Sequence, residues 1–244
     1  MPKKVVRVES DRAGRDSEPT WTPSPEAKQK ATRYRMIALA LWVVAIAGEA
    51  FAIFWVLKQP SVNLIVLIVA IVLIGALSVG GSLLWKRANQ ADPARRSDTV
   101  RFFIQNQLGA IIAAVAFLPL IVMILLNDNM DRTQKTIAGG LAVVVLAIAG
   151  AAGVSTNSPS VEGYDAETNQ VIQYTGQDLV FWTKEGSVYH LCQQASAVNL
   201  ESKDNTIYSG TVGDAHADGK QRLTLQVDQE LRQCGFATPT PASS

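Results

Sequence analysis

The sequence predicts a membrane all-α protein: a four-helix transmembrane bundle with a small α+β soluble domain at its C-terminus. Of its 244 residues, 48% are hydrophobic and 18% are charged, and the apolar ones are concentrated between residues 34 and 154. A bilayer-spanning helix needs roughly 20 mostly apolar residues. Four segments meet that requirement: 34–57, 61–85, 102–126 and 136–154. They show almost none of the polar stripe that marks a surface helix of a soluble protein.

Polar segments lie on both sides of this apolar region. Residues 1–33 form a basic arm that mixes charges with Pro, Ser and Thr, so we expect it to be disordered. Residues 155–236 carry the acidic soluble domain, and residues 237–244, rich in Pro, Thr and Ser, are expected to form a disordered tail. The first apolar segment is too long for a signal peptide and has no convincing cleavage site, so we expect none.

Basic residues flank the apolar segments unevenly, which predicts a topology for a multi-pass protein of the plasma membrane. Cytoplasmic loops of membrane proteins are enriched in Lys and Arg. Two segments are rich in them: Lys3, Lys4, Arg7, Arg12, Arg15, Lys28, Lys30, Arg33 and Arg35 before the first span, and Lys86, Arg87, Arg95, Arg96 and Arg101 between the second and third. The other connections hold only Lys58, Arg132 and Lys135. The N-terminus and, after four spans, the C-terminal domain are therefore expected in the cytoplasm.

Glu49 is the only acidic residue well inside a predicted span. A carboxylate in hydrocarbon is costly unless it is protonated or paired. One interpretation makes Glu49 a proton-relay or ion-binding group. The other, which we favour because no second charge lies inside a span, makes it a protonated side chain that hydrogen-bonds a neighbouring helix. Ala38, Ala45 and Ala52 share its helix face and mark a surface for close helix packing.

The apolar segments lack the residues that bind redox cofactors. Both His and both Cys of the chain lie outside them, so the bundle cannot supply a bis-His haem site or an iron–sulfur cluster. The sequence has no Walker A motif, nucleophile elbow or HExxH motif. We therefore expect no catalytic residues and no cofactor. As partners we expect other integral membrane subunits and lipids, and no nucleic acid.

Short apolar stretches separated by turn residues predict the α+β character of the C-terminal domain. The expected elements are strands at 171–174, 179–183 and 187–191, a hairpin turn at 184–186 and a helix at 193–200. Thr211 has the spacing of a helix N-cap, with Asp214 three residues later and Gly219 as the stop. A domain this small buries little core, so we expect it to need a disulfide, a metal or a partner.

The stretch VFWTKEGSVYH, from Val180 to His190, resembles the start of a small module on many bacterial membrane-associated and secreted proteins. That module reads V-Y-x-T-x-x-G-x-x-Y-H, a nearby Cys, an I-x-x-G-T-x-x-x-A-x-x-x-G-K stretch and a C-x-x-C pair. Its second stretch is matched here by Ile207, Gly210, Thr211, Ala215, Gly219 and Lys220. In the module the His and three Cys look like a zinc site. This chain departs from the pattern, because Cys192 follows His190 closely and Leu231 stands where the first Cys of the pair would be.

Three interpretations of His190, Cys192 and Cys234 stay open. The two Cys could form a disulfide, which would favour an extracytoplasmic domain and so conflicts with the predicted topology. They could bind a metal together with His190 and a fourth ligand such as His216. Or they are packed as small hydrophobic residues without either role.

By its size, its layout and the 182–192 stretch, the whole chain also resembles accessory subunits of the actinobacterial cytochrome bcc–aa3 respiratory supercomplex. That resemblance implies a structural role at a membrane interface between redox subunits of a respiratory chain. The function we expect is therefore that of a non-enzymatic accessory or scaffold subunit of a larger membrane complex. The alternatives are a membrane-anchored metal-binding or redox-responsive sensor, and a small transporter.

Overall fold

The structure is a computed structural model that describes residues 3–8, 21–155 and 158–237. It divides into two compact units whose segments alternate along the chain. The bundle unit contains residues 31–89 and 98–158. The mixed unit contains the residues up to 30, residues 90–97 and the residues from 159 onward.

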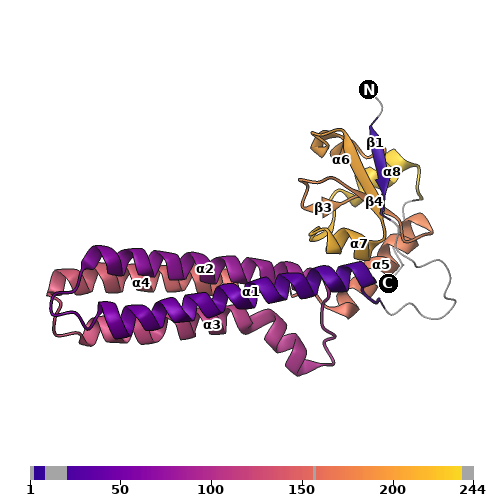
Figure 1. Ribbon diagram of the computed structural model, residues 1–244. Coiled ribbons are helices and arrows are strands. Elements are labelled where there is room, and N and C mark those ends of the chain that lie inside the picture. The colour runs from indigo at the N-terminus through magenta and orange to yellow at the C-terminus, as the bar shows by residue number, and fades with distance from the viewer. Residues whose placement is uncertain (1–2, 9–20, 156–157, 238–244) are drawn as a thin grey trace, which may run out of the picture. The chain divides into compact units, whose positions relative to one another are not determined.

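Four long helices make up the bundle unit, and Figure 1 shows them running side by side. They are α1 (Pro25–Phe51), which continues as the π-helix Ala52–Val56, α2 (Leu64–Ala91), α3 (Thr99–Leu126) and α4 (Arg132–Gly153). All four are long and apolar enough to cross a membrane. The prediction of four long apolar helices is confirmed. Each helix also extends past its predicted span at one end, because the helical backbone continues where hydrophobicity has already stopped.

Side-chain caps set the starts of α3 and α4. Asp98 caps α3 by accepting a hydrogen bond from the backbone N–H of Arg101 at 3.2 Å. Asp131 begins α4 with a capping box, in which it accepts from the N–H of Gln134 while the Gln134 side chain accepts from the N–H of Asp131. Each cap pairs donors that the first turn of a helix leaves open. The helix α3 runs unbroken through Pro119.

Small residues let the helices of the bundle unit approach closely. A Cβ on Gly153 of α4 would overlap the backbone of Ala110 in α3, so these two backbones touch. A Cβ on Gly81 of α2 would likewise overlap the indole of Trp42 in α1. Contacts of this kind hold helices together in lipid, where burying an apolar side chain gains little.

The predicted packing face of α1 points into the bundle unit. Ala38, Ala45 and Ala52 are fully buried, and Glu49 is almost so. The largest apolar core of the unit draws residues from all four helices. The small residues of this face are therefore used within the bundle itself.

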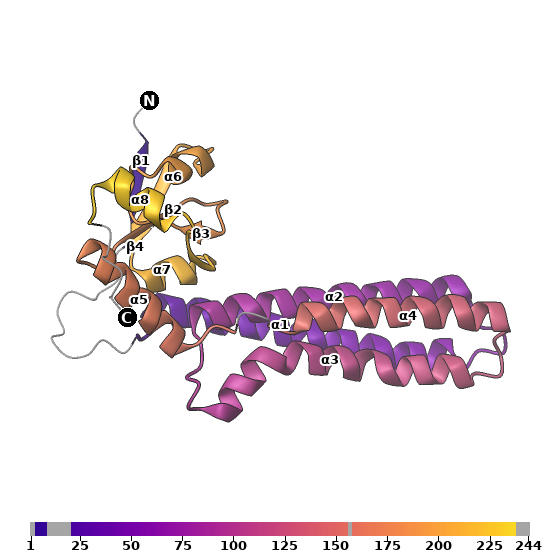
Figure 2. The same ribbon diagram turned by 180° about the vertical axis from the view of Figure 1, so that it is seen from behind.

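The mixed unit combines short strands with short helices (Figure 2). Its elements are β1 (Lys4–Arg7), α5 (Val161–Thr175), β2 (Val180–Trp182), β3 (Val188–Tyr189), α6 (Ser196–Glu201), β4 (Thr206–Gly210), α7 (Val212–Ala217), β5 (Arg222–Leu223) and α8 (Val227–Cys234). In a three-stranded sheet, β4 lies in the middle, parallel to β1 and antiparallel to β2. The strands β3 and β5 form a second, parallel pair. The largest core of the unit includes Trp182, Tyr189 and Leu231.

Three distant stretches of chain meet in the mixed unit. The strand β1 pairs with β4 along its whole length. Residues 90–97 join at the start of α5, where the backbone N–H of Val161 donates to the carbonyl of Ala94 at 3.2 Å. The stretch before α1 joins through Trp21, whose ring packs edge-on against Tyr164. The segments before α1, between α2 and α3, and after α4 therefore belong to one body.

The expectation of a disordered arm over residues 1–33 is wrong for the stretches that the structure describes. Residues 4–7 form β1, because the edge of β4 offers backbone partners to a short extended segment. Trp21 is buried, and α1 begins at Pro25. Residues 9–20, and the predicted tail from residue 238 on, lie outside the described residues.

One predicted strand of the mixed unit is also wrong. Residues 171–174 lie in α5, which Ser160 caps at its start and Gly176 ends in the left-handed conformation. Tyr164 and Val171 are seven residues apart, so they share one face of a helix, and both are buried. The caps and this spacing outweigh the β-branched run that suggested a strand.

The predicted turn and cap further along are confirmed. Phe181 and His190 exchange backbone hydrogen bonds of 2.9 and 2.7 Å across the turn between β2 and β3. Thr211 caps α7 in a capping box with Asp214. Gly219 follows the helix with a φ of +84°, a conformation that favours glycine.

Candidate functional site

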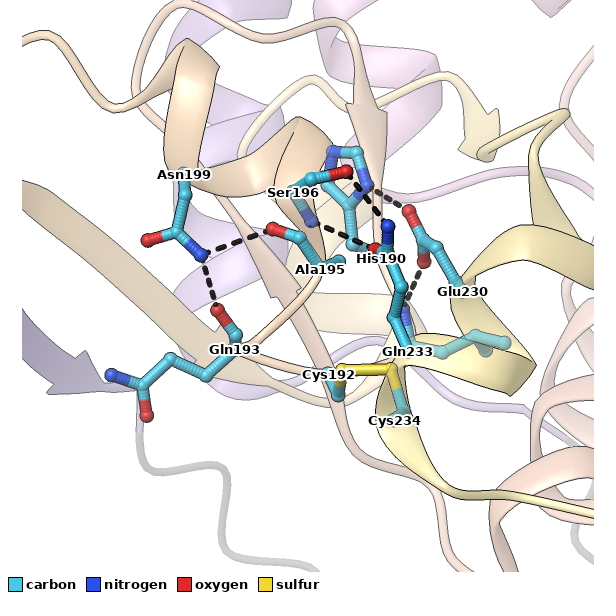
Figure 3. Close-up of a disulfide and its surroundings, with 10 residues drawn as sticks. His190, Cys192, Gln193, Ala195, Ser196, Asn199, Glu230, Gln233 and Cys234 are labelled. Atoms are coloured by element: carbon cyan, nitrogen blue, oxygen red, sulfur yellow. Dashed lines mark hydrogen bonds and ion pairs between the residues drawn. A yellow bond between two sulfur atoms is a disulfide. The ribbon is translucent and has the colours of Figure 1, made fainter.

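The last helix, α8, lays one face against the segment from His190 to Ser196 (Figure 3). Glu230 lies three residues before Gln233 and four before Cys234, which places all three on that face. Gln233 accepts a hydrogen bond from the backbone N–H of Ser196 at 2.9 Å and donates one to its hydroxyl at 3.0 Å. We call these three residues of α8 and their partners the α8 clasp.

A disulfide forms part of the α8 clasp. Cys192 and Cys234 are bonded, with Cα atoms 6.0 Å apart and a sequence separation of 42. Cys192 is buried in an apolar cluster with Val198 and Ile207. Of the three interpretations that the sequence left open, the disulfide is the arrangement that the structure contains. A cross-link across so long a loop strongly restricts the unfolded chain.

A buried His–Glu pair lies beside the disulfide. The Nδ1 atom of His190 is 2.6 Å from Oε1 of Glu230, and Oε2 of Glu230 accepts a hydrogen bond from the backbone N–H of Leu191 at 2.9 Å. Both side chains are almost completely excluded from solvent. A carboxyl group can lie in the interior because both of its oxygens are paired. The other ring nitrogen, Nε2, is 3.5 Å from a carboxylate oxygen of the partly exposed Glu201.

These residues do not fit the zinc site that the module resemblance implies. Zinc would need free thiolates, and both Sγ atoms are bonded to each other. Glu230 engages Nδ1 of His190, and Leu231 supplies no ligand atom. His216, the proposed fourth ligand, belongs to another cluster. Among the described residues no group of three or more His, Cys, Asp or Glu side chains is arranged to hold a metal ion.

His216 lies in a second buried cluster of the mixed unit. Its Nδ1 atom is 2.8 Å from the carbonyl oxygen of Lys220, and its Nε2 atom is 2.9 Å from Oε2 of Glu167. The same carboxylate accepts a hydrogen bond from the hydroxyl of Tyr189, and the ring of Tyr164 stacks on the imidazole with centroids 3.8 Å apart. Burial, reinforced by the Glu167 charge, raises the pKa of both tyrosines above its usual value. The tyrosines therefore stay neutral hydrogen-bond donors.

Lys220, which the module resemblance had singled out, is buried below the turn between β2 and β3. Its Nζ atom donates to the carbonyl oxygens of Thr183 at 2.6 Å, Lys184 at 3.2 Å and Gly186 at 2.5 Å. Burial lowers the pKa of this amino group, although nearby carboxylates oppose the shift. Its role here is to fix the shape of the turn.

Sequence reasoning missed Glu230 and Glu167. Glu230 could have been found from its spacing to Cys234, because a helix over 227–234 places residues four apart on one face. A disulfide from Cys234 to Cys192 then brings Glu230 to His190. No sequence pattern pointed to Glu167, because its partners Tyr189 and His216 lie far along the chain in β3 and α7.

Glu49 is buried inside the bundle unit. Its carboxyl group faces the backbone of Leu120 in α3, next to Pro119. Its Oε1 atom has no hydrogen-bond partner among the described residues. The π-helix Ala52–Val56 begins less than one turn later. The interpretation in which Glu49 hydrogen-bonds a neighbouring helix requires that its side chain lie against such a helix, and here that helix is α3.

No family model, no characterised protein and no solved structure matches the chain. The α8 clasp offers one reaction: an external thiol reductant that supplies two electrons and two protons would open the disulfide to two thiols and would itself be oxidised, and a disulfide oxidant would close the bond again. The His190–Glu230 pair and Gln233 would keep α8 in contact with its partner segment in both states.

Proposed function

We propose that the chain is an integral membrane protein whose four long helices cross the plasma membrane, and that it is a non-enzymatic accessory subunit of a larger membrane complex. At 1.5 Å per residue, the 28 residues of α2 or α3 extend about 42 Å, more than the roughly 30 Å hydrocarbon core of a bilayer. Apolar side chains on the outside of every helix suit a lipid environment. Examples at least half exposed are Val43, Leu73, Val122 and Val144.

The closed interior of the bundle unit carries the accessory-subunit part of the proposal. The backbones of α3 and α4 touch at Gly109 and Gly153, and apolar side chains from all four helices fill the core. Secondary transporters instead place their binding sites between discontinuous helices, whereas α2, α3 and α4 run unbroken. A filled bundle of this kind is suited to holding other subunits rather than to passing a solute.

One face of α4 is suited to contact with another membrane protein. Gly140, Ala147 and Ala151 are seven and four residues apart and exposed. A Cβ on Gly140 would meet nothing within 4 Å. Small residues allow the backbone of a partner helix to approach closely, so this face is where we place the partner subunit.

Respiratory redox complexes are the first partners to test, because of the resemblance to accessory subunits of the actinobacterial cytochrome bcc–aa3 supercomplex. In such a supercomplex this chain would fill a membrane interface. The electron-transfer cofactors would belong to the other subunits.

Purification in a mild detergent tests the accessory role. A tagged copy expressed in its own host should retain other integral membrane subunits at a fixed ratio, and the chain on its own should show no Soret band. Gly140→Leu should reduce the recovered subunits, while Val122→Leu, on the exposed side of α3, should not. Recovery of the chain alone from fully solubilised membranes, or a Soret band from the isolated chain, would contradict the proposal.

Variants of Glu49 distinguish a scaffold subunit from an ion carrier. Glu49→Gln keeps the size and hydrogen bonding of the side chain but removes its titration, so in a scaffold the complex should assemble and work like the parent. Glu49→Leu should weaken assembly modestly, because hydrogen bonds in membranes average only about 0.6 kcal/mol. Loss of proton-coupled activity in Glu49→Gln with intact assembly would instead make α1 part of a proton path.

The disulfide favours a second candidate function, that of a redox-responsive sensor. Cytoplasmic disulfides are rare and are usually transient, catalytic or redox-sensing. The basic segments predict that the mixed unit is cytoplasmic. On that side of the membrane Cys192 and Cys234 would be a redox-responsive pair, whereas on the other side they would be a structural bond.

Thiol labelling in intact cells decides between these roles. Leu225→Cys, at a position 79% exposed in the mixed unit, should react with a membrane-impermeant reagent only after permeabilisation. Asp128→Cys, between α3 and α4, should react without it. The reverse pattern would overturn the predicted topology and, with it, the sensor.

A further inference from the structure

The strand β1 lies at one edge of the three-stranded sheet, with β4 on one side and no strand of the described chain on the other. Its ladder with β4 is parallel, and the backbone N–H groups of Lys4 and Val8 both donate to carbonyl oxygens on the β4 side, at 2.9 and 2.7 Å. In such a ladder, alternate residues bond to the same neighbour. The backbone N–H and C=O groups of Val5 and Arg7 therefore point away from β4.

This outer edge of β1 is open to a partner. Lys4, Val5 and Arg7 are exposed, and even the apolar Val5 keeps 39% exposure. An exposed edge strand presents a row of unpaired backbone groups to which a further strand can be added. Strand addition of this kind is a common way for a folded domain to bind an extended segment of another protein.

The side chains of the edge determine which strand fits. Lys4 and Arg7 are the first and last residues of β1, and within the part of the chain that the structure describes neither forms an ion pair. Successive residues of a strand point to opposite faces, so Lys4 shares one face with Val6, and Arg7 shares the other with Val5. An added strand is stabilised when an acidic residue lies opposite each cation and an apolar residue lies opposite each valine.

A second copy of β1 does not meet this requirement. A twofold axis would place two β1 strands antiparallel, so that at full overlap Lys4 of each strand lies opposite Arg7 of the other. Like charges directly opposite each other on neighbouring strands are destabilising. Lysine on an edge strand also discourages pairing with an identical strand. The charge of β1 therefore disfavours self-association and favours an acidic partner.

We propose that the outer edge of β1 docks an extended acidic segment of a partner protein, which adds to the sheet as an antiparallel strand. The segment contains an acidic residue, two β-branched apolar residues and a second acidic residue, which lie opposite Arg7, Val6, Val5 and Lys4 in turn. Its backbone exchanges hydrogen bonds with Val5 and Arg7. This contact goes beyond the accessory role, because it needs neither a membrane nor the small-residue face of α4.

A synthetic peptide tests the docking edge. The probe is the acetylated and amidated peptide Thr-Glu-Val-Val-Glu-Thr, added at millimolar concentration to the full-length protein in detergent, and amide hydrogen exchange is followed by NMR. The Val5 and Arg7 amides should exchange fast in the free protein and about tenfold more slowly near saturation with the peptide. The Val6 amide, which faces β4, should be protected in both cases. Unchanged exchange at Val5 and Arg7 would overturn the proposal.

Reversal of the charges gives the matched control. The peptide Thr-Lys-Val-Val-Lys-Thr has the same length and strand propensity but should leave the exchange of the parent unchanged. In the double variant Lys4→Glu and Arg7→Glu, the preference for the two peptides should reverse. Protection of the Val6 amide shows whether β1 of the variant still pairs with β4.

A backbone variant remains informative if the double variant does not fold. Val5→Pro removes one outward N–H group and leaves the ladder to β4 intact, since proline is tolerated on an edge strand whose N–H faces solvent. The acidic peptide should then no longer slow exchange at Arg7.

Three outcomes contradict the proposal. Equal protection of the parent by the two peptides would show pairing without selection for acidic residues. Undiminished protection of Arg7 in Val5→Pro would show a charge contact rather than an added strand. Protection of Val5 and Arg7 that rises with protein concentration in the absence of peptide would show that a second copy occupies the edge.

Discussion

The interior of the bundle unit and the interior of the mixed unit are stabilised by different kinds of contact. In the bundle unit, helices meet through small and apolar residues, and the hydroxyls of Ser78 and Ser82 are buried without a hydrogen-bond partner among the described residues. In the mixed unit, buried charges are tied to named partners: Glu230 has two and Lys220 has three. The bundle unit thus depends on the fit of surfaces, and the mixed unit on directed bonds between distant segments.

This difference predicts opposite sensitivities. Where backbones touch, one added methyl group forces the surroundings to shift. Where a buried donor has one partner, the loss of that partner leaves the donor unpaired, which costs about 1–3 kcal/mol. Substitutions that add volume should therefore damage the bundle unit, and substitutions that remove a partner should damage the mixed unit.

The largest effect is expected from the disulfide. Replacing Cys192 and Cys234 by Ser frees a loop with a sequence separation of 42, for which chain entropy predicts a loss of about 4 kcal/mol in unfolding free energy. Amide hydrogen exchange of β2 and β4 in the full chain, in detergent, measures this loss. Reductant should destabilise the parent equally and leave the double variant unchanged. If the amide hydrogen exchange of β2 and β4 were the same in the fully reduced parent protein as in the oxidised one, the α8 clasp would not depend on the disulfide.

The next effect tests the bundle unit. Gly153→Ala places a methyl group against the backbone of α3 at Ala110 and should cost about 2 kcal/mol in detergent unfolding experiments. Gly140→Ala is the matched control, because the added group meets nothing within 4 Å. The control should be neutral or gain up to about 1 kcal/mol from helix propensity. Equal stability of the two variants would mean that α3 and α4 do not touch at Gly153.

Glu230→Gln tests the directed bonds of the mixed unit. A Gln side chain offers one acceptor oxygen where Glu230 offers two, so if that oxygen stays on the backbone N–H of Leu191, the amide N–H faces Nδ1 of His190, and the imidazole must take the tautomer whose Nδ1 accepts. The pair then loses its carboxylate as well as its original proton arrangement. We expect a loss of about 1–2 kcal/mol in unfolding free energy. Asp228→Asn makes the same chemical change on the exposed side of α8 and should stay within about 0.5 kcal/mol of the parent. A loss as large in Asp228→Asn would point to helix charge rather than to the buried pair.

The smallest effect depends on pH and tests whether residues 90–97 belong to the mixed unit. Desolvation acts to raise the pKa of the Glu162 carboxyl group, but the backbone N–H of Arg96 and the charges of Arg96 and Arg95 outweigh it and lower the pKa below its usual 4.5. Both carboxylate oxygens accept from that N–H, at 3.1 and 3.0 Å.

A lowered pKa means that the folded state favours the ionised form. The stabilisation is complete above pH 4.5 and is lost as the pH falls through the lower folded-state pKa. The difference in unfolding free energy between the parent and Glu162→Gln should therefore shrink as the pH falls below 4.5. A difference that stays constant down to pH 3 would exclude this link.

The four apolar helices could be predicted because hydrophobicity is a property of each segment alone. The same holds for the Thr211 cap, which Asp214 completes within one turn. The strand β1 could not be predicted, because four residues become a strand only beside β4, which follows much later in the chain. The helical state of residues 171–174 likewise depends on caps outside the run.

Within the candidate site, too, some residues could be predicted from the sequence and others could not. Cys192 and Cys234 were among the alternatives because cysteines are conspicuous in a short domain. Glu230 was not, because its role appears only once the chain has folded back on itself.

The pairing of β1 with β4 also bears on biosynthesis. The ribosome makes β1 first, and β4 emerges only after all four long helices. If those helices cross a membrane, the two strands can meet only when an even number of crossings has returned the chain to its starting side. A copy inserted with one crossing too few would leave an open strand edge, a surface prone to aggregation. The strand β1 would then cover that edge of β4 only in correctly inserted copies.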